Sequence, residues 1–111
     1  MEKEPTIHIV ATQCQPEVED KFNAWYDDIH IPMLLKYKGI TEVNRYKLAR
    51  ESEKYPKYLT IYKFESKDAY EAYKASPELA AAIEEAEGTW KEGGYEIKWR
   101  VQYEPMKTWR R

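Results

Sequence analysis

The 111-residue sequence lacks several features that common classes of protein require. It contains a single cysteine, Cys14, so no internal disulfide can form and an oxidising compartment is not implied. No segment approaches the ~20 consecutive apolar residues that span a bilayer, and the first residues lack an apolar stretch of signal-peptide length. We therefore expect a cytoplasmic protein that does not insert into membranes.

An excess of charge of one sign is also missing. The sequence has 18 Lys and Arg against 20 Asp and Glu, with both signs interspersed, whereas a nucleic-acid-binding domain needs a basic face. The two histidines, His8 and His30, and the single cysteine do not form a metal-ligand spacing. Glycine-rich phosphate loops and nucleophile motifs are absent. These observations predict no nucleic-acid partner, no metal and no cofactor.

Aromatic residues, in contrast, are abundant, with ten Tyr and four Trp. Tyrosine combines apolar area with a hydroxyl group, so it suits pocket walls and half-wet subunit interfaces. Hydrophobic residues make up 42% and charged residues 34%, which is typical of a globular protein. The length predicts a single domain over residues 1–111.

Periodicity predicts four strands, each with alternating or β-branched and aromatic residues. Their expected ranges are 6–13, 40–50, 58–64 and 95–103. In the last of these, Tyr95 to Tyr103, apolar and polar residues alternate strictly, so Lys98, Arg100 and Gln102 share one face.

Two helical segments separate these strands. Apolar residues at steps of three and four predict a helix from Pro16, which Pro32 should kink or break near His30 and Ile31. The second helix is expected to begin at a Ser66 cap, to restart at Ser76 and Pro77, and to end at Gly88.

This order of elements predicts an α+β fold, the ferredoxin-like βαββαβ arrangement, with a four-stranded antiparallel sheet and two helices on one face. Apolar residues occur at both parities of several strands, so the other face of the sheet also needs cover. We therefore expect a homodimer whose sheets meet face to face in a dimeric α/β barrel. Lys98, Arg100 and Gln102 would place polar side chains inside such a barrel, which counts against this pairing.

His30 is the candidate catalytic residue, because it falls at the rim of the apolar stripe of the first helix. There it could act as a neutral general base, with Tyr26 one turn before it on the same side. Asp27 could accept its other N–H and fix the tautomer. The alternative is a structural histidine that binds a backbone group freed by Pro32.

Further candidate contacts for a ligand are Trp25, Arg45, Tyr46, Tyr62 and Tyr73. Arg45 could bind an anionic or carbonyl group, and the tyrosines could supply hydroxyls. The alternatives are a salt-bridge partner for Arg45 and core or interface positions for the tyrosines. His8 is expected to be a satisfied polar group on a strand face.

Several segments together resemble the dimeric α/β-barrel superfamily, in particular its ethyl tert-butyl ether degradation (EthD)-like branch. They are WYDDIHIPMLLKYKGI (25–40), RY (45–46), YLTIYKFES (58–66) and SPE (76–78), with H-I-P the most specific element. The resemblance implies a homodimer with a pocket between sheet and helices in each subunit. Relatives include cofactor-free monooxygenases, muconolactone isomerases, polyketide cyclases with a His and Tyr pair, and haem-degrading enzymes.

The resemblance implies a cofactor-independent enzyme of monooxygenase, isomerase or cyclase type. Its substrate would be a small aromatic or polyketide-like carbonyl compound, with His30 as general base. The alternative is a non-catalytic module that binds a small hydrophobic ligand or only dimerises. A haem-degrading function is disfavoured because neither His8 nor His30 is where those relatives hold iron. Such a fold predicts the reaction poorly, since it hosts many functions.

Overall fold

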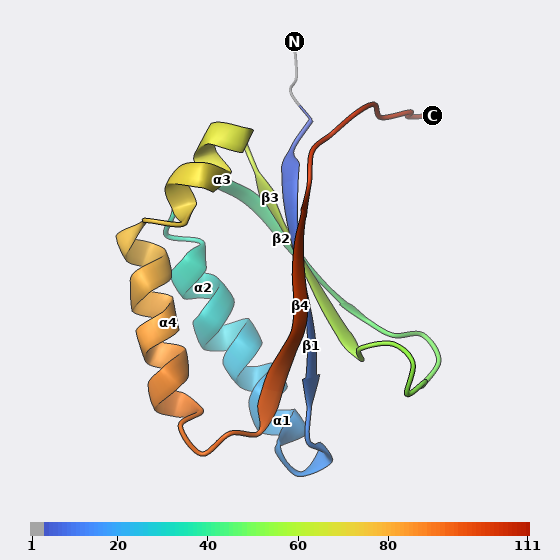
Figure 1. Ribbon diagram of the computed structural model, residues 1–111, viewed down its shortest axis with the longest axis vertical. Helices are drawn as coiled ribbons and strands as arrows, with labels where there is room; N and C mark the ends of the chain where they lie inside the picture. Colours follow the sequence, from blue (N-terminus) through green and yellow to red (C-terminus); the bar gives the residue numbers. More distant parts are fainter. Residues whose placement is uncertain (1–3) are drawn as a thin grey trace.

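The computed structural model describes residues 4–111 as a four-stranded sheet with helices on one face (Figure 1). The strands are β1 (Thr6–Cys14), β2 (Ile40–Lys47), β3 (Tyr58–Phe64) and β4 (Tyr95–Tyr103). Neighbouring strands are antiparallel and follow the order β2-β3-β1-β4. This confirms the predicted ferredoxin-like α+β fold. Within residues 4–111, every helix is too short or too polar to cross a membrane.

The first helical segment remains helical through Pro32. It consists of η1 (Pro16–Val18), α1 (Glu19–Trp25), the π-helical turn η2 (Tyr26–His30) and α2 (Ile31–Leu34). The N–H of Ile31 donates to the carbonyl oxygen of Tyr26, five residues earlier. Because the proline ring would clash with a carbonyl four residues before it, a wider turn accommodates Pro32. The predicted break is therefore a π-turn rather than an interruption.

The second helical segment consists of α3 (Lys67–Tyr73) and α4 (Pro77–Thr89). Ser66 and Ser76 cap these helices, as predicted, by accepting backbone N–H groups three residues later. Three predicted boundaries are wrong by a few residues. β1 extends to Cys14, β2 ends at Lys47 instead of 50, and α4 continues through Gly88.

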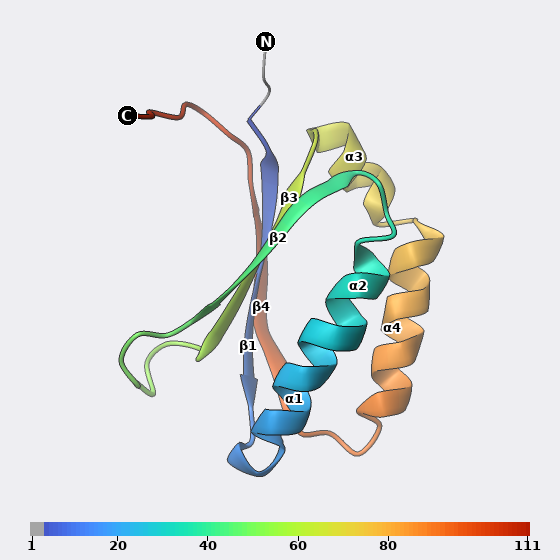
Figure 2. The ribbon, with the colours of Figure 1, turned by 180° about the vertical axis from the view of Figure 1, so that it is seen from behind.

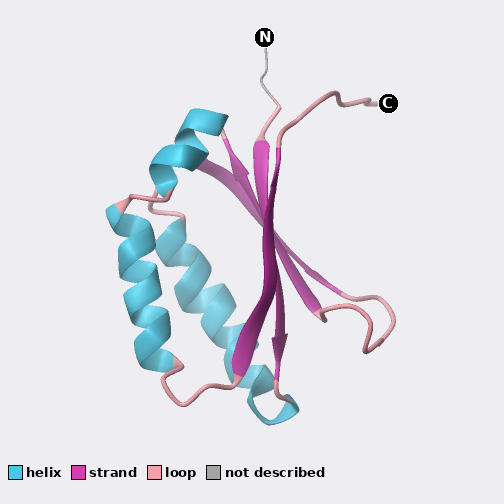
Figure 3. Cartoon of the chain, viewed as in Figure 1, coloured by secondary structure: helices cyan, strands magenta, loops and turns pink. Residues whose placement is uncertain are grey.

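The sheet has one face covered by helices and one face that this chain leaves uncovered (Figures 1, 2 and 3). In β3 the buried residues are Tyr58, Thr60, Tyr62 and Phe64, on the helix side, and the intervening residues point the other way. We call the uncovered side the open face. Its apolar residues on the three strands β1, β3 and β4 are Ile7, Ile9, Leu59, Ile61, Trp99 and Val101.

A bulge in β4 decides which of its residues lie on each face. Thr12 of β1 pairs with Ile97, and the adjacent Ala11 pairs with Trp99, so Lys98 is an extra residue in β4. Ile97 therefore faces the helices, whereas Trp99 lies on the open face. Arg100 also faces the helices, which corrects the expectation that one face carries every polar residue of this strand.

Phe22 occupies the centre of an aromatic cluster between α1, α4 and the sheet. Its side chain has no exposed surface and contacts the rings listed here, Trp25, Tyr26, Tyr58, Trp90 and Tyr95. We expect Phe22→Ala to lower the free energy of unfolding by about 3–5 kcal/mol, because it removes a full buried ring and leaves a cavity. Urea denaturation measures this change.

Two variants are matched controls for this prediction. Phe22→Leu keeps most of the buried volume and is expected to cost well under half as much. Met106→Ala removes an exposed side chain and is expected to be nearly neutral. A loss below about 1 kcal/mol in Phe22→Ala would contradict the central position of this ring.

Candidate functional site

A cavity of about 830 Å³ lies between the sheet and the helices. β1, β3 and β4 form one wall, and the first helical segment, α3 and α4 form the other. Four of the candidate residues line it, namely Tyr26, His30, Tyr62 and Tyr73. A cavity of this volume suits a small organic molecule. Helices and sheet therefore form a candidate binding site where part of the predicted set meets.

The π-turn positions His30 against two aromatic rings. Its imidazole stacks on Trp25, with ring centroids 4.6 Å apart, and meets the edge of Tyr26 at 5.0 Å. The Nδ1 atom is buried and has no hydrogen-bond partner within residues 4–111, so it is not bound to backbone freed by Pro32. π-turns are frequent at functional sites, because they re-aim side chains that a regular helix would place elsewhere.

Burial keeps both histidines of the cavity neutral near pH 7. Burial lowers the pKa of His30 to about 4, although nearby Glu85 opposes the shift. The pKa of His8 is likewise lowered to about 4, first by burial and then by the positive charges of Arg100 and Lys74. Each imidazole therefore retains an unprotonated nitrogen that can accept a proton or a hydrogen bond.

These shifts predict a pH dependence of stability. The unfolded chain protonates His8 and His30 near pH 6.5, whereas the folded chain does so only near pH 4. The unfolded state thus binds more protons in this range, and the free energy of unfolding should fall as the pH drops from 6.5 toward 4. Urea denaturation at a series of pH values measures the slope.

The double variant His8→Gln, His30→Gln is the control for this titration, because it removes both imidazoles and keeps polar side chains of similar size. It should lose the slope between pH 6.5 and 5. Carboxylates with lowered pKa values, such as Glu19 beside Lys57, change the free energy of unfolding only at lower pH. An equal slope in the double variant would show that the histidines are not responsible.

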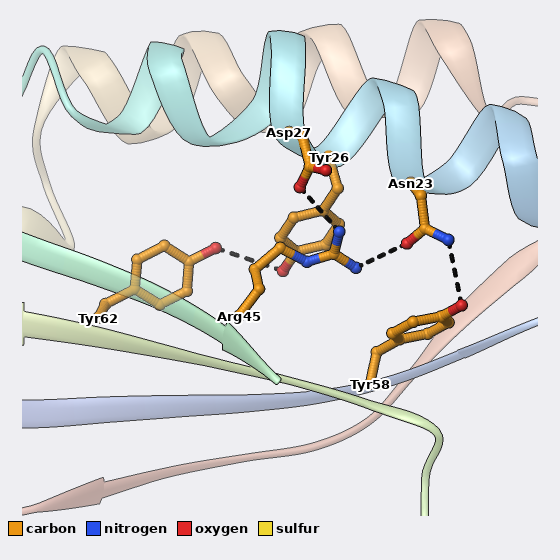
Figure 4. A network of polar contacts seen from close by, with 6 residues as sticks. All are labelled: Asn23, Tyr26, Asp27, Arg45, Tyr58 and Tyr62. Carbon is orange, nitrogen blue, oxygen red and sulfur yellow. Dashed lines mark hydrogen bonds and ion pairs between the residues drawn. The ribbon is translucent and has the colours of Figure 1, made fainter. Parts of the chain in front are cut away.

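Two tyrosine hydroxyls meet at the cavity wall. The Tyr26 and Tyr62 hydroxyl oxygens lie 3.3 Å apart, within hydrogen-bonding distance (Figure 4). Burial raises the pKa of Tyr62 well above 10, and burial also raises the pKa of Tyr73. The hydroxyls of Tyr62 and Tyr73 therefore remain protonated and can donate hydrogen bonds to a ligand oxygen.

Asp27 and Arg45 form a separate network outside the cavity. Arg45 donates to the Asp27 carboxylate at 2.8 Å and to the Asn23 side-chain oxygen at 3.0 Å (Figure 4). Its guanidinium lies 4.5 Å from the ring centroid of Tyr26. Asp27 is more than half exposed and does not orient His30. β2 thus brings Arg45 to Asp27, which is the ion-pair alternative given above for Arg45, and the Asp27 carboxylate faces Arg45.

Two other predicted ligand contacts also lie outside the cavity. Tyr46 is 54% exposed, because it alternates with Arg45 along β2 and points away from the helices. Trp25 is buried beneath His30, and its indole N–H donates to the Glu85 carboxylate at 2.7 Å. Trp25 therefore supports the imidazole rather than a ligand.

The basic or imidazole side chains of the cavity other than His30 were not predicted as site residues from the sequence, namely His8, Lys74 and Arg100. The bulge at Lys98 turns Arg100 inward, and the alternation of β1 places His8 on the helix side. The His8 ring hydrogen-bonds to the backbone at Val101, in keeping with the expected satisfied group, whereas its Nδ1 atom is buried without a hydrogen-bond partner within residues 4–111.

Buried polar atoms without partners are concentrated around this cavity. Besides the two histidines, Thr12 and Trp90 each contribute one such atom, counted within residues 4–111. A buried polar atom without a partner is unfavourable, so a polar ligand would satisfy it. In the same part of the chain, no group of three His, Cys, Asp or Glu side chains could hold a metal ion.

An antiparallel four-stranded sheet with helices on one face and a ligand-sized cavity between the layers defines a ferredoxin-like α+β protein. The chain belongs to the family described as "Domain of unknown function (DUF4286)", whose model matches residues 6–98. No curated protein matches it in sequence.

Solved structures share the fold at low sequence identity. HapK from Hahella chejuensis matches with a TM-score of 0.72 and 10% identity over 96% of this chain and 97% of that one. An EthD family protein from Bacillus halodurans C-125 matches with a TM-score of 0.65 and 15% identity, over 91% of this chain and 99% of that one. A dimeric ferredoxin-like protein of unknown function from Jannaschia sp. CCS1 matches with a TM-score of 0.60 and 22% identity, over 91% of this chain and 99% of that one. The resemblance to the EthD-like branch is confirmed at the level of the fold.

Proposed function

We propose that the cavity binds a small aromatic carbonyl compound and that the protein is a cofactor-independent enzyme of monooxygenase, isomerase or cyclase type. The observation that carries the proposal is the position of His30. Its neutral imidazole lines the cavity next to the Tyr26 ring, and its Nδ1 atom is buried without a partner within residues 4–111. A buried neutral base beside hydroxyl donors suits abstraction of a proton next to a carbonyl group.

In the proposed reaction, His30 accepts a proton from a C–H or O–H group conjugated with the substrate carbonyl. The electron pair left behind moves onto the carbonyl oxygen, and the hydroxyls of Tyr62 or Tyr73 donate hydrogen bonds to it. Burial makes imidazolium unfavourable in the free protein, but the new substrate anion and Glu85 stabilise it. Isomerase and cyclase types return the proton, whereas a monooxygenase type needs molecular oxygen as second substrate.

We also propose that the protein is a homodimer in which the open face of each sheet covers the other. The support is the apolar character of that face, where Trp99 of the edge strand β4 is 43% exposed beside the aliphatic side chains of β1 and β3. The Jannaschia relative of the same fold is named as dimeric.

The alternative proposal is a non-catalytic module that binds a small hydrophobic ligand or only dimerises. Its support is the number of tyrosines in the cavity and the core, since tyrosine can serve packing alone. Such a module would bind aromatic compounds saturably and release them unchanged.

One experiment tests the enzyme proposal against the non-catalytic alternative. Purified protein is incubated, with air present, with a panel of aromatic carbonyl compounds, and both saturable binding and product formation are followed by calorimetry and mass spectrometry. Product that depends on His30 supports the enzyme, and binding without product supports the module. No binding by any compound would rule out the small-molecule function.

A further inference from the structure

Positive charge gathers at one end of the cavity. Arg100 of β4 lies opposite Val10, and His8 of β1 lies opposite Gln102, so Arg100 and His8 are diagonal neighbours on the helix-facing side of the sheet. Such neighbours are roughly 7–8 Å apart, within reach of long side chains. Lys74, just after α3, lines the same cavity and its charge acts on His8. We call His8, Lys74 and Arg100 the basic end.

Arg100 is exposed at the mouth of the cavity and forms no ion pair within residues 4–111, so its guanidinium is available to a ligand. Lys74 is also exposed; its ammonium contacts the exposed carboxylate of Glu71 at 3.2 Å and lies 5.0 Å from the ring centroid of Tyr70. The His8 Nδ1 atom next to them also has no partner within this part of the chain. The basic end therefore combines a guanidinium without an ion pair and a His8 ring that uses one nitrogen for the Val101 backbone and keeps Nδ1 unpartnered.

Acidic groups of the cavity belong to its other end. Glu96 is four residues from Arg100 along β4, roughly 10 Å or more, and pairs with Lys98 at 2.6 Å. Glu87 belongs to the last turn of α4, three residues before Trp90. Glu85 acts on His30 and not on His8. The cavity is thus polarised, with positive charge at the basic end and carboxylates on the His30 side.

We propose that the basic end is a carboxylate-binding subsite, which makes the substrate class of the proposed enzyme small aromatic carboxylates. Arg100 offers a planar guanidinium that binds a carboxylate through two parallel hydrogen bonds, and His8 and Lys74 add a third contact. The ring lies against Tyr70 and Tyr73, which line the cavity beside this end. Its far substituent, a carbonyl group, then faces His30. This inference rests on the proposed function and specifies its substrate.

The electrostatics of His8 agree with such a subsite. Arg100 and Lys74 both lower the pKa of His8, because two positive charges disfavour imidazolium. A bound carboxylate reverses this effect, so binding should raise the pKa of His8 and take up a proton at moderately acidic pH. A neutral ligand in the same place lacks this effect.

The test compares two probes of nearly the same shape and different charge, 4-acetylbenzoate and 4-acetylbenzamide. Calorimetry measures the affinity of each for wild type and for Arg100→Gln. We expect wild type to bind the acid about tenfold or more tightly than the amide, because a hydrogen-bonded ion pair is lost with the amide. Arg100→Gln should lose this preference and keep its affinity for the amide.

Arg111→Gln is the matched control, because it removes the same charge from the exposed chain end and should keep the preference. Arg100→Lys keeps the charge without the planar guanidinium and should fall between wild type and Arg100→Gln. Circular dichroism verifies that each variant is folded. As a second measurement, NMR titration should show the pKa of His8 rising with the acid and not with the amide.

The possible results separate the subsite from the proposed function. Equal affinity for acid and amide would overturn the subsite and leave the small-molecule function standing. A preference that persists in Arg100→Gln, with no change in His8, would also overturn the subsite. If neither probe binds wild type up to millimolar concentration, the subsite is wrong and the panel of aromatic carbonyl compounds decides the proposed function alone.

Discussion

Replacing His30 with glutamine is expected to lower turnover of an aromatic carbonyl substrate by roughly 100- to 10,000-fold, the usual contribution of a general base. Glutamine is polar and of similar length, but it cannot accept the proton that the proposed reaction removes. Binding should change much less, because Tyr62, Tyr70 and Tyr73 still line the cavity. The fall should therefore occur in kcat, with the ligand Kd within a few-fold of wild type.

Asp27→Asn is the matched control for this prediction. Asp27 lies three residues before His30, but its carboxylate binds Arg45 and is more than half exposed. Its loss should change turnover by less than about threefold and stability by under 1 kcal/mol, as for exposed ion pairs. Equal turnover in His30→Gln and wild type would remove the general-base mechanism. A large loss in Asp27→Asn would show that Asp27 acts on the imidazole after all.

Ile61→Asp is expected to convert the proposed homodimer into a monomer. Ile61 pairs with Ile9 in the centre of the sheet and points to the open face. In a two-fold symmetric interface the substitution occurs twice, and both new charges would be buried close together. Because the desolvation of each buried ion costs several kcal/mol, the association should fail at micromolar concentration. Analytical ultracentrifugation of both proteins measures the masses in solution.

Leu35→Asp introduces the same charge at an exposed apolar residue on the helix side, where no second subunit is proposed. This control should keep the mass of wild type. A wild-type protein that sediments as a monomer would contradict the homodimer directly. A dimer that survives Ile61→Asp and dissociates with Leu35→Asp would place the interface on the helices instead.

The sequence predicts the fold well because its signals are local and repeated. Alternating residues define the strands, and Ser66 and Ser76 are caps whose hydroxyls accept the expected N–H groups. The order of elements then restricts the topology to few arrangements. Errors are confined to element ends, such as Gly88, where side chains do not determine the boundary.

The candidate site is less predictable, because it depends on two local irregularities. The π-turn changes the direction of His30 relative to a regular helix, and the bulge at Lys98 reverses the face on which Arg100 lies. Pro32 is a visible signal for the first, but no residue type announces the second. The sequence does not reveal that Arg45 pairs with Asp27, because the two residues are 18 positions apart and only the folded chain brings them together. Sequence analysis therefore places both residues in the site.

The extra residue in β4 also determines how the chain can change during evolution. One strand of nine residues carries both the cavity wall, with Ile97 and Arg100, and part of the open face, with Trp99. Removal of Lys98 would leave these roles unchanged, because the remaining residues already pair in alternation, Ile97 with Thr12 and Trp99 with Ala11. Pairing of Lys98 within the ladder would instead send the indole inward and the guanidinium outward, so loss of the bulge with Lys98 retained alters ligand recognition and subunit association at once. Substitutions at the same positions can change each property separately.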